Sequence, residues 1–379
     1  MIQTRGFGGP FRYLQGPGAL KALPQLARPY GRKLLIVIDA FLYHDLKSLL
    51  ESYLQGSELT SIFHQFGGEC TLNEIDRLSQ LGQANRSEVI CGLGGGKTLD
   101  TAKLTAQALK KPLIIMPSSA STDAPVSAMG VIYQPDGRHL RCQLLEHAPE
   151  LILVDSSLIA QAPIRLFVAG LGDALSTHFE AQANALSHTP NYLGPGYQAT
   201  LAGAALAKTC HQVILKKGLK ALKALQKQKT SPDFEDVLEA NILLSGLGFE
   251  NNGCAAAHAL HTGIHEIEGS QRLYHGEVVA FGLLFQLILE KTVPKKLAPI
   301  VSFMAKVGLP LCFSDLGLPA SPKNLTLIST RLLDGNSGIE AEPFPVTKPL
   351  IKAALKEADH FGQAYRQTNP HLPPALCKP

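Results

Sequence analysis

Five of the thirteen histidines fall in three short segments after residue 162, and an aspartate lies in the first of them. These residues are Asp173, His178, His258, His261, His265 and His275. The spacing of three and four residues in the middle segment places its three imidazoles on one helical face. Imidazoles and a carboxylate from separate helices can hold a divalent metal with one open coordination position. A single histidine is more often a hydrogen-bonded structural residue than a metal ligand, and spacing does not choose among the three clustered ones.

Three consecutive glycines, residues 94–96, follow an apolar run and precede Lys97 at the start of a helical pattern. Residues without side chains let backbone N–H groups approach a phosphate, and the helix dipole favours negative charge there. A Walker A loop would need glycine five positions before Gly96, where this chain has Cys91. The usual dinucleotide fingerprint also fails, because it should open the first βα unit. The sequence therefore predicts a phosphate-binding loop of another type, made by Gly94, Gly95, Gly96 and Lys97.

Asp39 ends an apolar run and precedes the glycines in the chain. A carboxylate at the end of a strand can accept hydrogen bonds from both hydroxyls of an adenosine ribose, and it repels a 2′-phosphate. An aspartate at this place can equally cap the following turn. The sequence alone leaves both interpretations open.

The elements that must position these residues change character near residue 162. Short β-branched or leucine-rich runs alternate with helical patterns before it, at residues 33–38, 59–63, 89–93, 113–117 and 151–154. This alternation predicts a parallel sheet covered by helices. Residues 130–145 differ, because two strand-like runs flank the turn sequence Pro135, Asp136 and Gly137. They predict a hairpin attached to the sheet.

After residue 162 the pattern changes to long segments with a period of 3.6 residues. These segments are residues 198–213, 235–247 and 277–289. The sequence therefore predicts an α/β N-terminal dinucleotide-binding domain over residues 1–162, with a parallel sheet plus hairpin. An all-helical C-terminal domain for metal and substrate follows over residues 163–379. The polar, proline-rich residues 367–379 are expected to form an extended strap or a frayed end.

Composition limits the class of protein. The chain has 379 residues, of which 45% are hydrophobic and 17% charged, so it can bury a large core. Its net charge is only +4, with scattered basic residues, so neither nucleic acid nor a membrane surface is expected as a partner. The seven cysteines are dispersed and indicate free thiols in a reducing compartment. No signal-peptide pattern opens the chain, and residues 278–289 are too few to span a bilayer, so we expect a cytoplasmic protein.

Six runs together resemble the glycerol dehydrogenase branch of the iron-containing alcohol dehydrogenase family. The runs are GGGKTLDTAK (94–103), ASTDAP (120–125), AGLGDAL (169–175), GFENNGCAAAHALHTG (248–263), YHGEVVAFG (274–282) and FPVT (344–347). They occur in the order typical of that family and cover nearly the whole chain. Each run alone is weak, but the six together are specific.

The resemblance implies which residues form the reacting centre. Asp173, His258 and His275 are implied to bind the metal, which is Zn in this branch, and Asp123 is implied to contact a polyol. His261 is implied to lie beside the reacting centre without binding the metal, and His265 is an extra imidazole. The ligand types would also accept Fe(II), Mn or Ni, so zinc rests on the resemblance.

The resemblance also implies how the cofactor NAD is bound, in part by backbone groups. The expected contact residues are Asp39, Gly94, Gly95, Gly96, Lys97, Asp100, Ser118, Ser121, Ser127, Met129 and Tyr133. Members of the family are implied to assemble as homo-oligomers, from dimers up to octamers.

The predicted reaction is the oxidation of glycerol, or of a related vicinal diol, by NAD. A Lewis-acidic metal would lower the pKa of the alcohol, and hydride would pass to the nicotinamide. A lyase resembling dehydroquinate synthase is one alternative, but it needs a basic pocket where the site segments here supply acids and hydroxyls such as Asp123 and Ser121. Two further alternatives are a dehydrogenase that acts on another polyol and an NAD-binding sensor without catalytic activity. The presence of all three implied metal ligands argues against the sensor.

Overall fold

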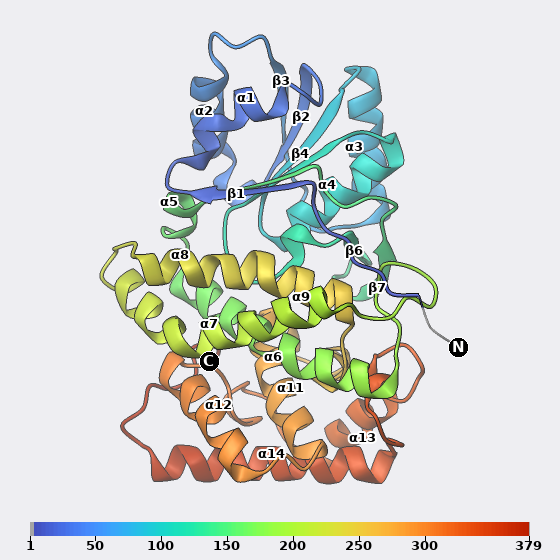
Figure 1. Cartoon of the computed structure of the whole chain (residues 1–379), viewed down its shortest axis with the longest axis vertical. Helices are drawn as coiled ribbons and strands as arrows, with labels where there is room; N and C mark the ends of the chain where they lie inside the picture. Colours follow the sequence, from blue (N-terminus) through green and yellow to red (C-terminus); the bar gives the residue numbers. More distant parts are fainter. Residues whose placement is uncertain (1–3, 379) are drawn as a thin grey trace. The chain divides into compact units, whose positions relative to one another are not determined.

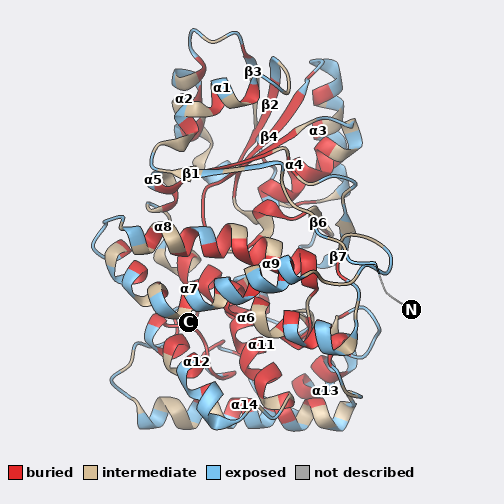
Figure 2. Ribbon diagram, viewed as in Figure 1, coloured by how far each residue is buried: buried red, intermediate tan, exposed pale blue. Residues whose placement is uncertain are grey.

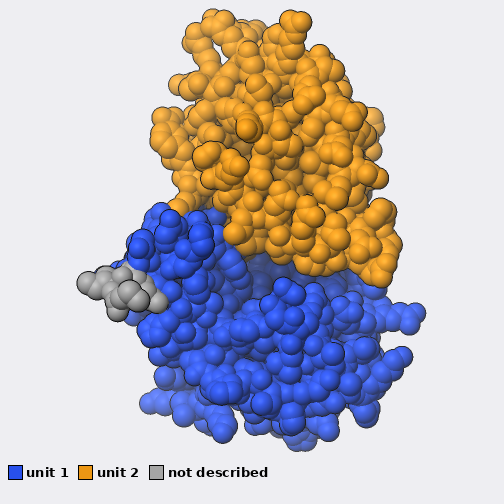
Figure 3. Space-filling view, turned by 90° about the vertical axis from the view of Figure 1, so that its right-hand side faces the viewer, with its two compact units in different colours: residues 1–7, 163–379 blue, residues 8–162 orange. Residues whose placement is uncertain are grey.

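The structure is a computed structural model and describes residues 4–378 of the chain (Figure 1). The chain divides into two compact units, Gly8–Ala162 and Met1–Phe7 together with Pro163–Pro379 (Figure 3). Arg5 forms an isolated bridge with Gln198, and the amide of Gly6 donates to the carbonyl of Gln198 at 3.1 Å. Residues 4–7 therefore pack with the helical unit, although the sequence predicts them within the α/β domain. The prediction that residues 1–162 and 163–379 fold as separate domains stays a prediction.

The α/β unit is built on the predicted parallel sheet, and the predicted fold class is confirmed. Its strands are β1 (Arg12–Gly16), β2 (Lys33–Ile38), β3 (Thr60–Gln65), β4 (Val89–Gly94), β5 (Leu113–Pro117) and β8 (Leu151–Asp155). They lie in the order β1-β8-β5-β4-β2-β3, and every neighbouring pair is parallel. The direction of winding reverses between β2 and β4. In open parallel sheets, ligands bind at the carboxyl ends of the strands at such a point.

Helices cover both faces of this sheet. Residues Leu34, Ile36 and Ile38 of β2 pack toward α1 (Leu23–Ala27) and α2 (Tyr43–Leu54) in one hydrophobic cluster. On the opposite face lie α3 (Leu72–Ala84) and α4 (Gly96–Leu109), where a Cβ on Gly92 would touch Ala102 of α4. Central strands are therefore buried on both sides (Figure 2). This burial explains why they appear in the sequence as continuous apolar runs.

Two features of this unit differ from the prediction. Strand β1 was missed, because its residues RYLQG are exposed or half-buried at the sheet edge and contain no apolar run. The predicted hairpin exists as β6 (Met129–Tyr133) and β7 (His139–Leu144), but it forms a two-stranded sheet of its own. It is attached through α4, since the amide of Val131 donates to Asp100 Oδ2 at 3.1 Å. Short helices complete the unit: η1 (Ala19–Ala22), η2 (Ala40–Leu42), η3 (Ala124–Val126) and α5 (Ser156–Ile159).

The second unit is built from helices, as predicted. They are α6 (Ile164–Ser187), α7 (Leu201–Leu225), α8 (Pro232–Glu239), the π-helix η4 (Ala240–Leu244), α9 (Ser245–Asn252), α10 (Ala256–Ile264), η5 (Ser270–Arg272), α11 (His275–Leu289), α12 (Pro294–Val307), α13 (Pro322–Arg331), η6 (Ile339–Ala341) and α14 (Lys348–Thr368). Helix α11 is buried on nearly all sides, which accounts for its apolar sequence. No helix in the described part of the chain is both long and apolar enough to cross a lipid bilayer.

The described end of the chain forms a strap. Helix α14 continues to Thr368, and the residues after it pack back on the helical unit. The amide of Leu376 donates to the carbonyl of Gly308 at 2.9 Å, and Arg272 donates to the carbonyl of Cys377 at 2.6 Å. Of the two expectations for this tail, the strap is therefore the one that the structure adopts.

Candidate active site

The three glycines connect β4 to α4 where the winding of the sheet reverses. A Cβ on Gly94 would lie 2.8 Å from the Cβ of Thr98 and 2.9 Å from that of Asp39, so this position has room only for glycine. A Cβ on Gly95 would meet no atom within 4 Å among the described residues. Gly94 therefore packs tightly against Thr98 and Asp39, while Gly95 faces open space at the start of α4. Backbone amides at a helix start beside open space suit a phosphate group.

Asp39 follows β2 and lies beside the glycine loop. Its Oδ2 accepts a hydrogen bond from the hydroxyl of Thr98 at 3.2 Å, and its amide donates to the carbonyl of Leu93 at 3.0 Å. Its Oδ1 accepts from the amide of Phe41 at 3.0 Å and so caps η2. The capping interpretation is thus confirmed. It is compatible with a ribose contact, because each carboxylate oxygen can accept more than one bond.

Lys97 makes two contacts that the sequence does not predict. Its ammonium group lies 2.6 Å from the carboxylate of Glu69 and 4.8 Å from the centre of the Tyr133 ring. Burial raises the pKa of Tyr133. Glu69 lies in the loop before α3, and its sequence surroundings give no signal of this role. The Tyr133 ring of the hairpin therefore lies beside Lys97 of the expected phosphate loop.

The segment that runs from the end of β5 to the first residue of β6 carries four further expected cofactor residues. Ser118 and Ser127 are buried there, and Ser121 and Met129 are half-buried. The fully buried Lys103 of α4 fixes this segment by donating to the carbonyls of Ala124 at 2.5 Å and Met129 at 2.8 Å. A buried lysine held by such bonds is a structural anchor, and the predicted NAD contacts of the segment stay predictions.

Asp123 and Asp100 are the two expected site residues of this unit with buried carboxylates. Asp123 is buried just before η3, and the amide of Ala124 donates to the hydroxyl of Thr122 at 2.9 Å. Asp100 is buried on α4, where Oδ2 accepts from the Val131 amide and Oδ1 from Lys103 at 3.3 Å. These bonds give Asp100 a structural role in holding the hairpin on α4. Its predicted contact with NAD stays a prediction.

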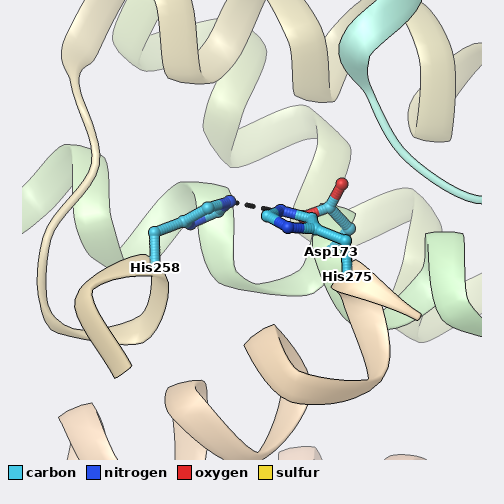
Figure 4. Close-up of side chains that lie close together, drawn as sticks. All are labelled: Asp173, His258 and His275. Carbon is cyan, nitrogen blue, oxygen red and sulfur yellow. Dashed lines mark ion pairs between the residues drawn. The ribbon is translucent and has the colours of Figure 1, made fainter. Parts of the chain in front are cut away.

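In the helical unit, Asp173, His258 and His275 come together from α6, α10 and α11 (Figure 4). His275 Nε2 lies 3.3 Å and His258 Nε2 lies 3.4 Å from Oδ1 of Asp173. One potential ligand atom from each residue lies within 4.8 Å of the others. The carboxylate is buried, and the side chain of His275 is 33% exposed. Two imidazole nitrogens and a buried carboxylate oxygen are a donor set for a divalent metal.

Close helix crossings explain why these three residues meet. A Cβ on Gly276 would overlap the carbonyl of Ala169, so only glycine lets α11 approach α6 at this point. A Cβ on Gly282 would overlap the carbonyl of Ala257, so α10 and α11 are equally close. Gly276 directly follows His275, and Ala257 directly precedes His258. Packing of backbone against backbone therefore sets the distances among the three side chains.

An ion pair holds the start of α11. Arg165 of α6 donates from Nε to Glu277 Oε1 at 2.6 Å and from a terminal nitrogen to Oε2 at 2.8 Å. Glu277 Oε2 also accepts from the amide of Tyr274 at 2.8 Å, which caps the helix. This two-bond geometry between guanidinium and carboxylate is strong and directional. It fixes the turn that carries His275.

The charges around the three residues favour a cation. Burial opposes ionisation of Asp173, but the imidazoles of His275 and His258 hold the pKa of its carboxyl well below the usual range. Burial likewise opposes protonation of His258, but Cys254, Glu180 and Asp173 raise the pKa of that imidazole well above its ordinary value. Two buried carboxylates thus stabilise positive charge at one ring. The negative charge of the same carboxylates would also stabilise a bound divalent metal ion.

A second group shares His258. Glu180, Cys254 and His258 also offer ligand atoms within 4.8 Å of one another. Burial raises the pKa of the Cys254 thiol, whereas a metal needs the thiolate. The two oxygens of Glu180 already accept hydrogen bonds from Ala255 and from the amide and ring of His258. The group with Asp173 is therefore the better metal site.

The other three of the five clustered histidines lie in two different places. His261 Nε2 lies 3.0 Å from His265 Nε2, and the His261 ring centre lies 4.2 Å from that of His275. His261 is therefore beside the candidate metal ligands, where the resemblance placed it. His178 lies elsewhere, with its ring centre 5.3 Å from that of His211 and 5.4 Å from that of Phe179. Four of the five clustered histidines therefore lie at or beside the candidate metal site, and His178 does not.

The chain is similar to known proteins in both sequence and fold. The sequence profile of the family "Iron-containing alcohol dehydrogenase" matches residues 10–156. A glycerol dehydrogenase of Thermotoga maritima is 41% identical over 96% of this chain and 98% of its own length.

Two crystal structures share the fold. Glycerol dehydrogenase from Schizosaccharomyces pombe superposes with a TM-score of 0.92 at 33% identity, covering 100% of this chain and 97% of its own. A probable glycerol dehydrogenase from Sinorhizobium meliloti gives a TM-score of 0.90 at 39% identity, covering 95% of this chain and 100% of its own. Similarity of this extent reaches both units. The chain therefore belongs to the iron-containing alcohol dehydrogenase family.

Proposed function

We propose that this protein is an NAD- and metal-dependent dehydrogenase that oxidises glycerol, or a related vicinal diol, to the corresponding ketone. Glycerol would give dihydroxyacetone. The observation that carries the proposal is the convergence of Asp173, His258 and His275 from three helices. The names of the relatives from Thermotoga maritima and Schizosaccharomyces pombe support glycerol as the substrate.

The donor set fits one divalent ion. Asp173 would supply a negative oxygen, and His258 and His275 would each supply a ring nitrogen. We assign zinc, although the same ligands would accept iron, manganese or nickel. When bound, the ion supplies a Lewis acid that favours the alkoxide form of an alcohol near neutral pH, and NAD supplies the hydride acceptor. His275, the more exposed of the two imidazoles, marks the side from which a substrate would enter.

The chain's other residues would bind and orient the two reactants. Gly95, Gly96 and Lys97 would hold the NAD pyrophosphate at the start of α4, and Asp39 would accept bonds from the adenosine ribose. Further contacts to the cofactor would come from the β5–β6 segment and the hairpin, through Ser118, Ser121, Ser127, Met129 and Tyr133. Asp123 would accept a hydrogen bond from a polyol hydroxyl that is not the one being oxidised. His261 would lie beside the reacting alcohol.

The lyase alternative is weaker than this proposal. A phosphorylated acid needs a basic pocket, whereas the segments expected to contact the substrate supply acids and hydroxyls such as Asp123 and Ser121. The expected homo-oligomer stays a prediction.

An absorbance assay of NADH formation tests the proposed function. Glycerol, 1,2-propanediol and 2,3-butanediol are assayed with NAD, each before and after chelation of the metal and again after zinc is restored. We expect turnover of glycerol and the vicinal diols that is lost on chelation and recovered with zinc. Absence of turnover on every polyol tested would contradict the proposal, and turnover that survives complete metal removal would contradict its mechanism.

A further inference from the structure

Helix α10 presents His258, and buried side chains from other elements hold its first turn. The first amides of any helix have no partner inside the helix. Here the amides of Ala255 and His258 donate to Oε1 of Glu180 at 2.8 and 2.9 Å. The Ala256 amide donates to Oε1 of Glu342 at 3.2 Å, and the Ala257 amide to Oε1 of Gln286 at 3.1 Å. The orientation of this helix end therefore depends on three residues distant in sequence.

Glu180 differs from the other two because it also reaches the ring of His258. Its Oε2 lies 2.6 Å from His258 Nδ1 and accepts from the hydroxyl of Ser176 at 3.1 Å. A carboxylate only accepts hydrogen bonds, so the ring donates from Nδ1. Nε2 is then the nitrogen left to bind a metal, and it is the one that faces Asp173.

One helix contacts both nitrogens of this imidazole. Asp173 and Glu180 lie seven residues apart on α6, which is two helical turns, so they share one face. Asp173 lies at Nε2 of His258, and Glu180 lies at Nδ1. Both carboxylates are buried, with side-chain exposures of 1% and 0%. The ring is thereby held in a single orientation.

We propose that Glu180 is a positioning residue for the metal, which sets the tautomer and the orientation of His258 and thereby the metal affinity. The inference rests on the proposed function, because it assigns the metal to Asp173, His258 and His275. Mutation of a carboxylate that holds a metal-binding histidine in this way typically lowers the metal affinity by about 10- to 100-fold.

The test compares Glu180→Gln with a matched variant. The substituted amide keeps an oxygen for the amides of Ala255 and His258, but its NH₂ group would donate to Nδ1 and favour the tautomer with hydrogen on Nε2. Glu342→Gln is the control, because Glu342 caps the same helix end through Ala256. Burial, together with the charge of Glu290, raises the pKa of Glu342 to about 8, so glutamine resembles its neutral form.

The measurement is zinc affinity of the full-length, metal-free proteins, by competition with a chromophoric chelator. We expect roughly a 10- to 100-fold loss in Glu180→Gln and a change of less than about twofold in Glu342→Gln. The absorption spectrum of the cobalt(II)-loaded protein should change only in Glu180→Gln. NADH binding, followed by fluorescence, should be unaltered in both variants.

Equal zinc affinity in wild type and Glu180→Gln would overturn the inference, because a residue that only caps the helix would still act through the glutamine oxygen. An equal loss in both variants would also overturn it and leave Glu180 as a structural cap. If Glu180→Gln does not fold, Ser176→Ala removes one bond to Oε2 and should lower the affinity by a smaller factor; an unchanged affinity there overturns the inference. A wild-type protein that takes up no metal would contradict the proposed function itself.

Discussion

The expected cofactor loop and the candidate metal centre are built in opposite ways. The loop is one contiguous stretch, Gly94 to Lys97, between a strand and a helix, and it offers mainly backbone groups. The metal centre draws three side chains from α6, α10 and α11, and it depends on where those helices cross. A contiguous loop needs only its local conformation to be correct. A centre made by three helices needs the packing of the whole helical unit.

The two regions also differ in how they use glycine. Gly95 in the loop has open space around it, which leaves room for a ligand. Gly276 and Gly282 in the helical unit have no room at all, and they let helix backbones touch. Glycine thus serves ligand access in one region and helix packing in the other, so substitutions at the two kinds of position should fail differently.

The largest effect should come from removing a metal ligand. His275→Ala takes one of three donors from the centre while leaving the α/β unit untouched, so bound metal should be lost and kcat/KM for glycerol should fall at least roughly thousandfold, or ~4 kcal/mol. Metal analysis of the purified variant and NADH fluorescence titration measure the two regions separately. A variant that keeps one ion per chain and near-normal turnover would contradict the ligand assignment.

Alanine substitutions at the two kinds of glycine sharpen the comparison. Gly276→Ala places a methyl group against the Ala169 carbonyl, so it should destabilise the protein by about 1–3 kcal/mol and weaken metal binding. Gly95→Ala meets no atom within 4 Å in the described structure, so its thermal stability should match wild type while NAD binds more weakly. Thermal unfolding, metal content and NADH titration are compared for both. Similar melting temperatures in the two variants would show that the helix crossing tolerates a side chain.

Cofactor choice tests the α/β unit alone. Asp39 lies at the end of β2 beside the glycine loop, where its charge would repel the 2′-phosphate of NADP. Asp39→Gly should reduce the preference for NAD over NADP by about tenfold or more, or ~1.4 kcal/mol, and leave metal content unchanged. Steady-state kinetics with both cofactors provide the ratio. If the wild-type enzyme already uses NADP as well as NAD, Asp39 does not face the ribose.

The smallest expected effect concerns the substrate. Asp123→Asn removes a charged acceptor for a polyol hydroxyl, which should lower kcat/KM on glycerol and vicinal diols by roughly tenfold. A mono-alcohol such as 2-propanol lacks that hydroxyl and serves as the internal control, with a much smaller loss. An equal loss on both kinds of substrate would mean that Asp123 supports its loop or the cofactor instead.

The same contrast explains what the sequence could and could not predict. Buried parallel strands such as β2 and β4 were predicted because two-sided burial produces an apolar run, whereas β1 at the sheet edge leaves no such run. The glycine loop was found from its neighbours in the chain. Spacing could not choose among His258, His261 and His265, because the three are spaced to share one helical face; the resemblance made that choice.

The contacts that the sequence did not predict are tertiary ones. Glu180 at His258, Arg165 at Glu277 and Glu69 at Lys97 each join elements that are distant in the chain. For Glu180 a signal was present, since it lies two turns from Asp173 on the same helix. Glu69 lies in a loop whose path only the folded unit determines.

X-ray absorption at the metal K-edge of the zinc-loaded enzyme tests the central assignment most directly. Zinc on Asp173, His258 and His275 should show only nitrogen and oxygen neighbours at about 2.0–2.2 Å. Zinc on the neighbouring group of Glu180, Cys254 and His258 would add a sulfur neighbour at about 2.3 Å. We predict one ion per chain and no sulfur neighbour. A sulfur neighbour that disappears in Cys254→Ser would place the metal in the other group and contradict the site proposed for catalysis.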